Sequence, residues 1–128
     1  MNTTSEATEM SRHIVQTIYN AMASGDVGTV LELIDENIVC YESPSLPYGK
    51  VYRGHNELKA LFEPVNTYLA IEKIKIDYLI ADGERVVAVI RLPVRSSGTE
   101  MIVSEHHLVR NGKVVEQRIF FFEPTLVR

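Results

Sequence analysis

Glu42 is the acidic side chain of this sequence with the clearest capacity for chemistry. It follows the β-prone run 38–41 and stands directly before Ser43 and Pro44. A carboxylate buried on an apolar strand has its pKa raised by desolvation, which suits it to moving a proton near neutral pH. Glu42 is therefore our main catalytic candidate, and the alternative is a solvated carboxylate at the end of a strand.

Two adjacent histidines, His106 and His107, lie in the predicted strand 101–110. Neighbouring residues on a strand point to opposite faces, so the two rings cannot bind one metal ion together unless the strand bulges. We expect one of them at most to line a pocket as a polar partner. The alternative for either is a partly buried strand histidine that forms hydrogen bonds. No metal site and no cofactor are predicted.

Tyr48 and Tyr52 stand in a loop that also contains Pro47, Gly49 and Gly54. Proline and glycine interrupt regular structure, so this segment is the best candidate for the wall or lid of a pocket. Tyrosine combines an apolar body with a polar tip, which suits it to ligand contact. We expect at least one of the two to touch a ligand, and the alternative is that they plug the pocket mouth.

The last predicted strand, 114–122, carries large apolar groups on both of its faces. Alternate residues share a face, so one set could line a pocket while the other forms an outer surface. An apolar outer face beside charged residues favours an interface with a second copy of the chain, that is, a homodimer. The candidate pocket residues are Gln117, Phe121 and Glu123, and the candidate interface residues are Arg118, Phe120 and Phe122.

The first half of the chain has helical periodicity. Apolar residues recur every four positions from Met10 to Met22, which places both methionines in the buried stripe of a helix. Asp26 can cap a second helix, and Pro64 should end or distort a third. The predicted helices are 8–23, 27–35 and one around Leu58, Leu61 and Phe62.

The second half has the two-residue period of strands, with turn signals at Asp82-Gly83 and Asn111-Gly112. Helices followed by an antiparallel meander predict an α+β domain with the three helices packed on one face of a curved, mainly antiparallel sheet. Such a sheet can leave an apolar hollow beneath the helices, where small ligands usually bind. The predicted strands are 74–80, 86–92, 101–110 and 114–122, after a short strand at 38–41.

Length and composition indicate one ordinary globular domain. The chain has 128 residues, 45% of them hydrophobic and 23% charged, and we expect a single domain over 1–128 with a flexible start at 1–7. A net charge of −4 argues against nucleic acid as a partner. A single cysteine, Cys40, and the absence of a secretion signal or membrane-spanning run indicate a cytoplasmic protein without membrane association.

Four short stretches are similar to a known superfamily: YNAMASGD at 19–26, YESP at 41–44, LPYGKVYRG at 46–54 and NGKVV at 111–115. On these the chain resembles the nuclear transport factor 2-like proteins, which include ketosteroid isomerases, limonene epoxide hydrolases and SnoaL-like polyketide cyclases. The resemblance implies a cone-shaped, cystatin-like fold with a deep apolar pocket, commonly dimeric through the outer face of its sheet.

The resemblance to the isomerases also implies roles for particular residues. A carboxylate general base stands there at the position of Glu42, and a tyrosine on the first helix and a protonated aspartate donate hydrogen bonds to the substrate. The tyrosine position falls on Ile18, with Tyr19 one residue out of phase, which counts against steroid isomerisation.

The second donor of the isomerases aligns with His106, and a shift of one residue would replace it by Glu105 or His107. In the SnoaL-like cyclases an acidic residue near the end of the last strand acts as acid or base, and Glu123 lies near that position. Limonene epoxide hydrolases need an Asp-Arg-Asp set, which this strand does not reproduce because Arg118 has the opposite parity to Glu123.

We therefore expect the protein to bind a small apolar or weakly polar ligand. If it is an enzyme, we expect an isomerase or cyclase that transfers a proton without a cofactor. The alternatives are a non-catalytic ligand-binding or dimerisation module and an epoxide hydrolase-like hydrolase. The predicted catalytic residues are Glu42 and His106, and the predicted ligand-binding residues are Tyr19, Tyr48, Tyr52, Gln117, Phe121 and Glu123.

Overall fold

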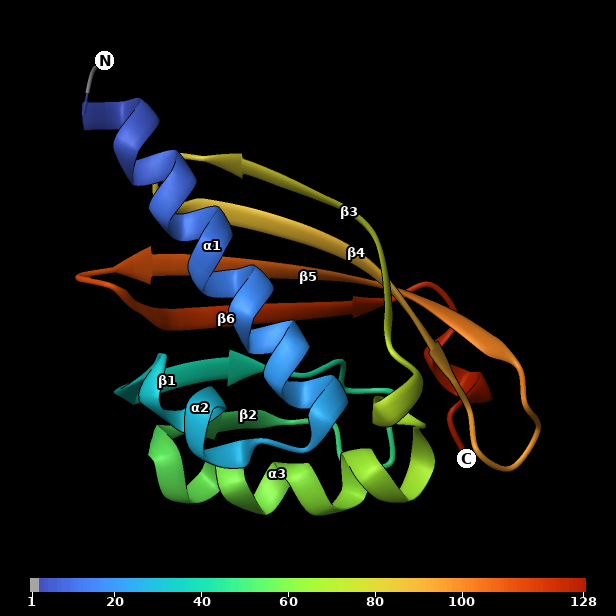
Figure 1. Cartoon of the computed structure of the whole chain (residues 1–128). Helices are drawn as coiled ribbons and strands as arrows, with labels where there is room; N and C mark the ends of the chain where they lie inside the picture. Colours follow the sequence, from blue (N-terminus) through green and yellow to red (C-terminus); the bar gives the residue numbers. More distant parts are fainter. Residues whose placement is uncertain (1–2) are drawn as a thin grey trace.

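A long helix crosses one face of a curved six-stranded sheet (Figure 1). The computed structural model describes residues 3–128, and the side chains from residue 5 onward. The helices are α1 (Thr3–Ser24), α2 (Val27–Glu32) and α3 (Gly54–Tyr68), with short 3-10 helices at Ile71–Lys73 and Pro124–Leu126. The strands are β1 (Ile34–Tyr41), β2 (Val51–Arg53), β3 (Lys75–Asp82), β4 (Arg85–Pro93), β5 (Glu100–Arg110) and β6 (Lys113–Phe121).

The sheet has the order β2-β1-β6-β5-β4-β3. Strands β3 to β6 form the predicted antiparallel meander, and β1 joins it by pairing in parallel with β6. The β5–β6 turn is the predicted Asn111-Gly112 hairpin, in which both residues have positive φ, 52° and 77°, as a type I′ turn requires. The predicted α+β class, with three helices on a mainly antiparallel sheet, is confirmed.

Several predicted boundaries and placements are wrong, each for a local reason. The second helix ends before Ile34, whose side chain is buried as the first residue of β1, opposite Val114. Helix α3 continues four residues past Pro64. The carbonyl that proline leaves without its helical hydrogen bond belongs to Ala60, an exposed residue, so water can replace the missing donor.

The buried stripe of α1 is narrower than predicted. Ile14 and Ile18 are buried, whereas Met10 is 60% exposed and Met22 only packs at the edge of the core. A four-residue step turns a helix about 40° beyond a full turn, so a run of such steps leaves the core-facing side. Helix α1 also includes residues 3–7, and residues 1 and 2 of the expected flexible start lie outside the described residues.

Strands β4 and β5 set the inner wall of the molecule. On β4, Val86, Ala88 and Ile90 are almost fully buried, and on β5 the buried positions before residue 108 are the odd-numbered ones. Alternation therefore turns Glu105 and His107 toward the helices. Within the described residues no helix has the length and apolar character needed to cross a membrane.

Candidate functional site

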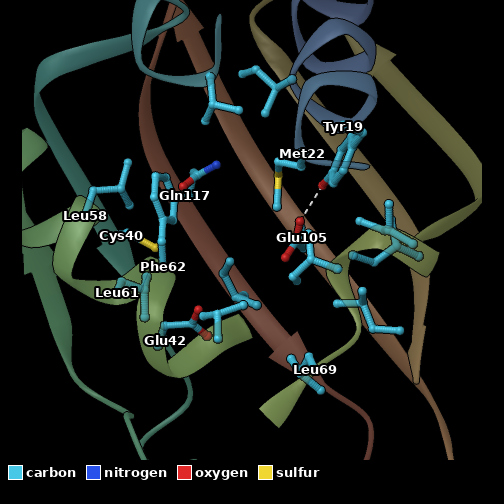
Figure 2. Close-up of a pocket in the computed structure, with 18 of the residues that line it drawn as sticks. Tyr19, Met22, Cys40, Glu42, Leu58, Leu61, Phe62, Leu69, Glu105 and Gln117 are labelled. Carbon is cyan, nitrogen blue, oxygen red and sulfur yellow. Dashed lines mark hydrogen bonds between the residues drawn. The ribbon is translucent and has the colours of Figure 1, made fainter. Parts of the chain in front are cut away.

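A mostly apolar cavity of about 70 Å³ lies between the helices and the inner face of the sheet. Apolar side chains from α1, α3 and the meander form most of its wall (Figure 2). Its acidic, phenolic, imidazole and amide lining residues are Tyr19, Glu42, Tyr48, Glu105, His107 and Gln117. An apolar hollow with a few polar groups is the usual form of a small-molecule site.

A hydrogen-bonded chain of four side chains crosses one part of this cavity. The hydroxyl of Tyr19, on α1, lies 2.5 Å from Oε1 of Glu105 and 2.8 Å from Nε2 of His107. His107 stands opposite Gln117 in the β5–β6 register, and the amide nitrogen of Gln117 lies 3.3 Å from Nδ1 of His107. Tyr19, Glu105, His107 and Gln117 form what we call the inner chain.

The protonation of His107 gives the inner chain a direction. Burial, assisted by the charge of His106, lowers the pKa of His107 to about 3, so its ring is neutral at physiological pH. Because Nδ1 faces the amide N–H of Gln117, the single ring proton lies on Nε2 and is donated to the hydroxyl oxygen of Tyr19. Tyr19 in turn donates to Glu105. Each donor therefore points toward the Glu105 carboxylate.

Both carboxyl groups of the cavity have pKa values shifted to the neutral range. Burial raises the pKa of Glu105 to about 7, although the hydrogen bond from Tyr19 acts in the opposite direction. Burial, and then the negative charge of Glu105, raise the pKa of Glu42 to about 8. Figure 2 shows both carboxyl groups extending into the cavity.

Glu42 and Tyr48 form a second polar group at the cavity, which we call the outer pair. Oε1 of Glu42 and the hydroxyl of Tyr48 are buried, and neither has a hydrogen-bond partner within residues 3–128. Each residue is only 8% exposed. The outer pair thus differs from the inner chain, in which hydrogen bonds link all four side chains.

The loop between β1 and β2 holds Tyr48 in place. The backbone N–H of Glu42 donates to the carbonyl of Lys50, and the hydroxyl of Tyr52 donates to the carbonyl of Tyr48 at 2.6 Å. At Gly49 a Cβ atom would lie 2.0 Å from the carbonyl oxygen of Ser43. The loop therefore closes this tightly only because residue 49 is glycine.

Of the eight predicted site residues, five line the cavity and three do not. His106 is exposed on the outer face, where its ring packs 5.0 Å from that of Phe120. Tyr52 is buried outside the cavity and supports Tyr48, and Glu123 is exposed beyond the end of β6. The five that line the cavity are Glu42, Tyr19, Tyr48, Gln117 and Phe121.

The prediction that His106 lines the pocket is wrong by one position along the strand. The two alternatives, Glu105 and His107, both face the cavity. The sequence contains a signal for this parity. Met101 and Val103 are the apolar odd-numbered residues at the start of the same strand, and they face the core. Glu105 and His107 share their face by alternation.

The profile of the SnoaL-like domain matches residues 15–117. No curated protein matches the chain in sequence. An NTF2-like protein from Burkholderia xenovorans is 27% identical with a TM-score of 0.76, covering 94% of this chain and 93% of its own. One from Burkholderia thailandensis is 25% identical with a TM-score of 0.77, over 91% and 92% of the two chains.

Bal32a, from a soil-derived mobile gene cassette, has a TM-score of 0.80 over 92% of this chain and 93% of its own. At 21% identity this likeness shows the fold alone. A protein of unknown function from Xanthomonas campestris, described as having a cystatin-like fold, is 19% identical with a TM-score of 0.78, over 90% and 92% of the two chains. The expected nuclear transport factor 2-like, cystatin-like fold is confirmed.

Proposed function

Because the chain belongs to the SnoaL-like domain family, a family of small-molecule-binding folds, we propose that it binds a small, weakly polar carbonyl compound in this cavity and moves a proton on it without a cofactor. The reaction class is isomerisation or cyclisation. One observation carries the proposal: Glu42 and Glu105 line a single apolar cavity, with pKa values of about 8 and about 7.

Two interacting carboxyl groups with pKa values in this range titrate as a pair. Near neutral pH the pair holds about one proton, because ionising one group disfavours ionising the other. The cavity then offers a carboxylate that can accept a proton and a carboxylic acid that can donate one. These are the two groups that acid–base catalysis beside a carbonyl requires.

The proposed step is balanced without an oxidant or a metal. The carboxylate takes a proton from a carbon next to the substrate carbonyl, and the C–H electron pair becomes the C=C bond of an enolate. The negative charge moves to the carbonyl oxygen, where a hydrogen-bond donor stabilises it. Return of the proton to a different carbon completes an isomerisation. In a cyclisation, the enolate carbon forms a C–C bond to a second carbonyl of the substrate, and the proton returns to the alkoxide oxygen that this attack produces.

The cavity volume limits the ligand. A cavity of about 150 Å³ can hold benzene, and the cavity here has about 70 Å³. Met22 and Phe62, which line the cavity and are half-buried, are the side chains we expect to move aside. We expect a ligand of about one ring.

The divergence of β1 and β6 offers a candidate route to the cavity. The last parallel pair is Tyr41 with Arg118; beyond it β6 continues while the chain of β1 turns away. Glu42, Ile119 and Phe121 line both the cavity and an outer groove of about 340 Å³. We propose that the ligand enters here, past Glu42.

Deuterium exchange tests the proposal. Cyclic ketones and enones, cyclopentenone among them, are incubated with the protein in deuterium oxide, and loss of the proton next to the carbonyl is followed by NMR. We expect enzyme-dependent exchange that Glu105→Gln slows about 10³-fold and that the surface variant His106→Gln retains. Exchange that persists unchanged in both Glu42→Gln and Glu105→Gln would remove the carboxyl pair from the mechanism.

The alternative of a ligand-binding module without catalysis is favoured by the outer pair, because a bound ligand could supply its missing hydrogen bonds without reacting. This alternative predicts saturable binding with no exchange. The epoxide hydrolase alternative lacks its triad, since no aspartate or arginine occurs among the described residues that line the cavity.

We also propose that the outer face of the sheet pairs with a second copy of the chain. Phe120 and Phe122 are 53% and 77% exposed, with Tyr78, Ile80 and Ile102 also exposed on the meander. Exposed apolar residues gathered on one sheet face are typical of an interface. A homodimer is the simplest assembly that would cover them.

A further inference from the structure

The outer pair is the least satisfied polar feature of the described core. Oε1 of Glu42 and the hydroxyl of Tyr48 are both buried without a partner among residues 3–128, and both residues line the cavity. Buried polar atoms in folded proteins are rarely left unpaired, and each unpaired atom lowers stability. A ligand that reached these two atoms would restore the hydrogen bonds that the protein itself does not supply.

The protonation of the outer pair identifies what it can bind. Oε1 of the Glu42 carboxyl group has no partner, and the backbone of Ser43 only partly offsets the effect of burial on the pKa of Glu42. Burial raises the pKa of both Glu42 and Tyr48, so both are protonated at neutral pH. Oε1 of Glu42 and the Tyr48 hydroxyl are therefore two donors, and one carbonyl oxygen has two lone pairs to accept from them.

The inner chain has the opposite character. Its hydrogen bonds run from Gln117 through His107 and Tyr19 and end on Oε1 of Glu105. A carboxylate that accepts a hydrogen bond is stabilised in its charged form. Of the two carboxyl groups of the cavity, Glu105 is thus the one whose surroundings favour the ionised form that can accept a proton.

We propose that Glu42 and Tyr48 together bind the carbonyl oxygen of the ligand, and that Glu105 faces the carbon that loses its proton. The ligand class is a ketone or enone with one hydrogen-bond-accepting oxygen at its end and an otherwise apolar body. The oxygen-binding half of the proposal rests on the two buried, unpartnered atoms and on both of them being hydrogen-bond donors. The assignment of Glu105 as the base rests on the proposed function.

In the proposed step, the C–H bond next to the carbonyl breaks and its proton moves to Glu105. The electron pair forms the C=C bond, and the negative charge develops on the oxygen held by Glu42 and Tyr48. Two preorganised donors at that oxygen stabilise the enolate more than the ketone, which is the condition for catalysis. Glu42 acts here as a hydrogen-bond donor, the reverse of the base role that the family resemblance implies for its position.

The experiment removes the Tyr48 hydroxyl and follows a carbonyl directly. Cyclopentenone labelled with carbon-13 at its carbonyl is titrated into the wild-type protein, Tyr48→Phe and the surface control Tyr78→Phe. We expect a saturable downfield displacement of the carbonyl resonance in the wild type and Tyr78→Phe. In Tyr48→Phe we expect a smaller displacement and about fivefold weaker binding, the equivalent of one neutral hydrogen bond.

Thermal unfolding of the empty proteins adds a second measurement. Tyr48→Phe removes an unpartnered hydroxyl, so its Tm should equal or exceed that of the wild type. Tyr52→Phe removes a hydroxyl bonded to the carbonyl of Tyr48, so its Tm should fall. An equal fall in both variants would show that the Tyr48 hydroxyl has a partner in the empty protein and would overturn the proposal.

The remaining outcomes separate this inference from the proposed function. If the wild-type protein displaces the carbonyl resonance but catalyses no deuterium exchange, the oxygen-binding site is supported and the proposed catalysis is contradicted. If deuterium exchange occurs but the carbonyl displacement is identical in Tyr48→Phe and the wild type, catalysis is supported and the oxygen-binding site is contradicted. No displacement in the wild type overturns the site as well.

Discussion

The two faces of β5 place the same kinds of side chain in opposite environments. Glu105 and His107 point into the cavity and are 8% and 1% exposed, whereas His106, between them, lies exposed against Phe120. Burial shifts the pKa of Glu105 up to about 7 and that of His107 down to about 3. Two adjacent histidines therefore differ in role because of the face on which alternation places them.

The outer face carries exposed apolar side chains, among them Phe120 and Phe122. Its charged groups pair locally: the Arg118 guanidinium lies 2.9 Å from Glu116 and 4.5 Å from the centre of the Tyr41 ring. Exposed ion pairs of this kind contribute little to stability. The comparison teaches that the inner face carries buried titratable groups, whereas the outer face carries exposed apolar groups and charges that pair with their neighbours.

The largest expected effect is a difference in kcat/KM between variants of two neighbouring residues that lie on these two faces. Glu105→Gln removes the proposed proton acceptor and should lower kcat/KM about 10³-fold, in the range for loss of a general base. His106→Gln, the matched change on the outer face, should leave kcat/KM within about twofold. Steady-state isomerisation or exchange kinetics measure both, and equal losses in the two variants would contradict the division between faces.

On the outer face, Phe120→Asp should weaken self-association about 10²-fold, because a charge replaces an apolar side chain that a dimer would bury. Sedimentation equilibrium measures the dissociation constant, and exchange activity per chain serves as the control for folding. A wild-type chain that is monomeric at micromolar concentrations would show that the outer face is not a dimer interface.

On the inner face, Glu42→Gln should lower kcat about tenfold, much less than Glu105→Gln. An amide at residue 42 still donates a hydrogen bond to the ligand oxygen, although a weaker one. Kinetics of the two glutamine variants across a pH series provide the measurement. A larger loss in Glu42→Gln than in Glu105→Gln would reverse the two roles.

The last prediction concerns stability as a function of pH. Between pH 6.5 and about 8 the folded protein keeps protons on Glu42 and Glu105 that the unfolded chain, with ordinary pKa values near 4.5, has lost. The free energy of unfolding should therefore fall as pH rises through this window, by up to about 1.4 kcal/mol per pH unit for each proton. Below pH 6.5 the opposite shift of His107 opposes this trend.

Urea unfolding at several pH values measures the slope between pH 6.5 and 8. Glu42→Gln removes one of the two titrating groups and should flatten the slope. A wild-type protein whose stability rises through this window would contradict the raised pKa values.

Local turn chemistry and periodicity made most of the fold predictable. The Asn111-Gly112 hairpin and the meander follow from short-range signals. The edge strand β2 was not predicted, because three residues form it only by pairing with β1, and that pairing depends on the closure of the loop at Gly49. Helix α3 likewise continues past Pro64, where the local signal indicated an end.

The candidate site likewise has a part that local sequence predicts and a part that it does not. Glu42 and Tyr48 were predicted from local sequence. Glu42 stands at the end of a predicted strand, and Tyr48 stands in a loop rich in proline and glycine. The Tyr19–Glu105 contact joins residues 86 positions apart, so no spacing within the sequence reveals it. The error at His106 arose because a one-residue shift in alignment exchanges the two faces of a strand.

A carbon-13 NMR titration of the glutamate side-chain carboxyl groups tests the central claim most directly. The claim is that Glu42 and Glu105 share about one proton near neutral pH. In protein labelled at glutamate, we predict two carboxyl resonances that titrate near pH 8 and pH 7, one absent from Glu42→Gln and the other from Glu105→Gln. Glutamate resonances that have all reached their ionised positions well below neutral pH would contradict the account.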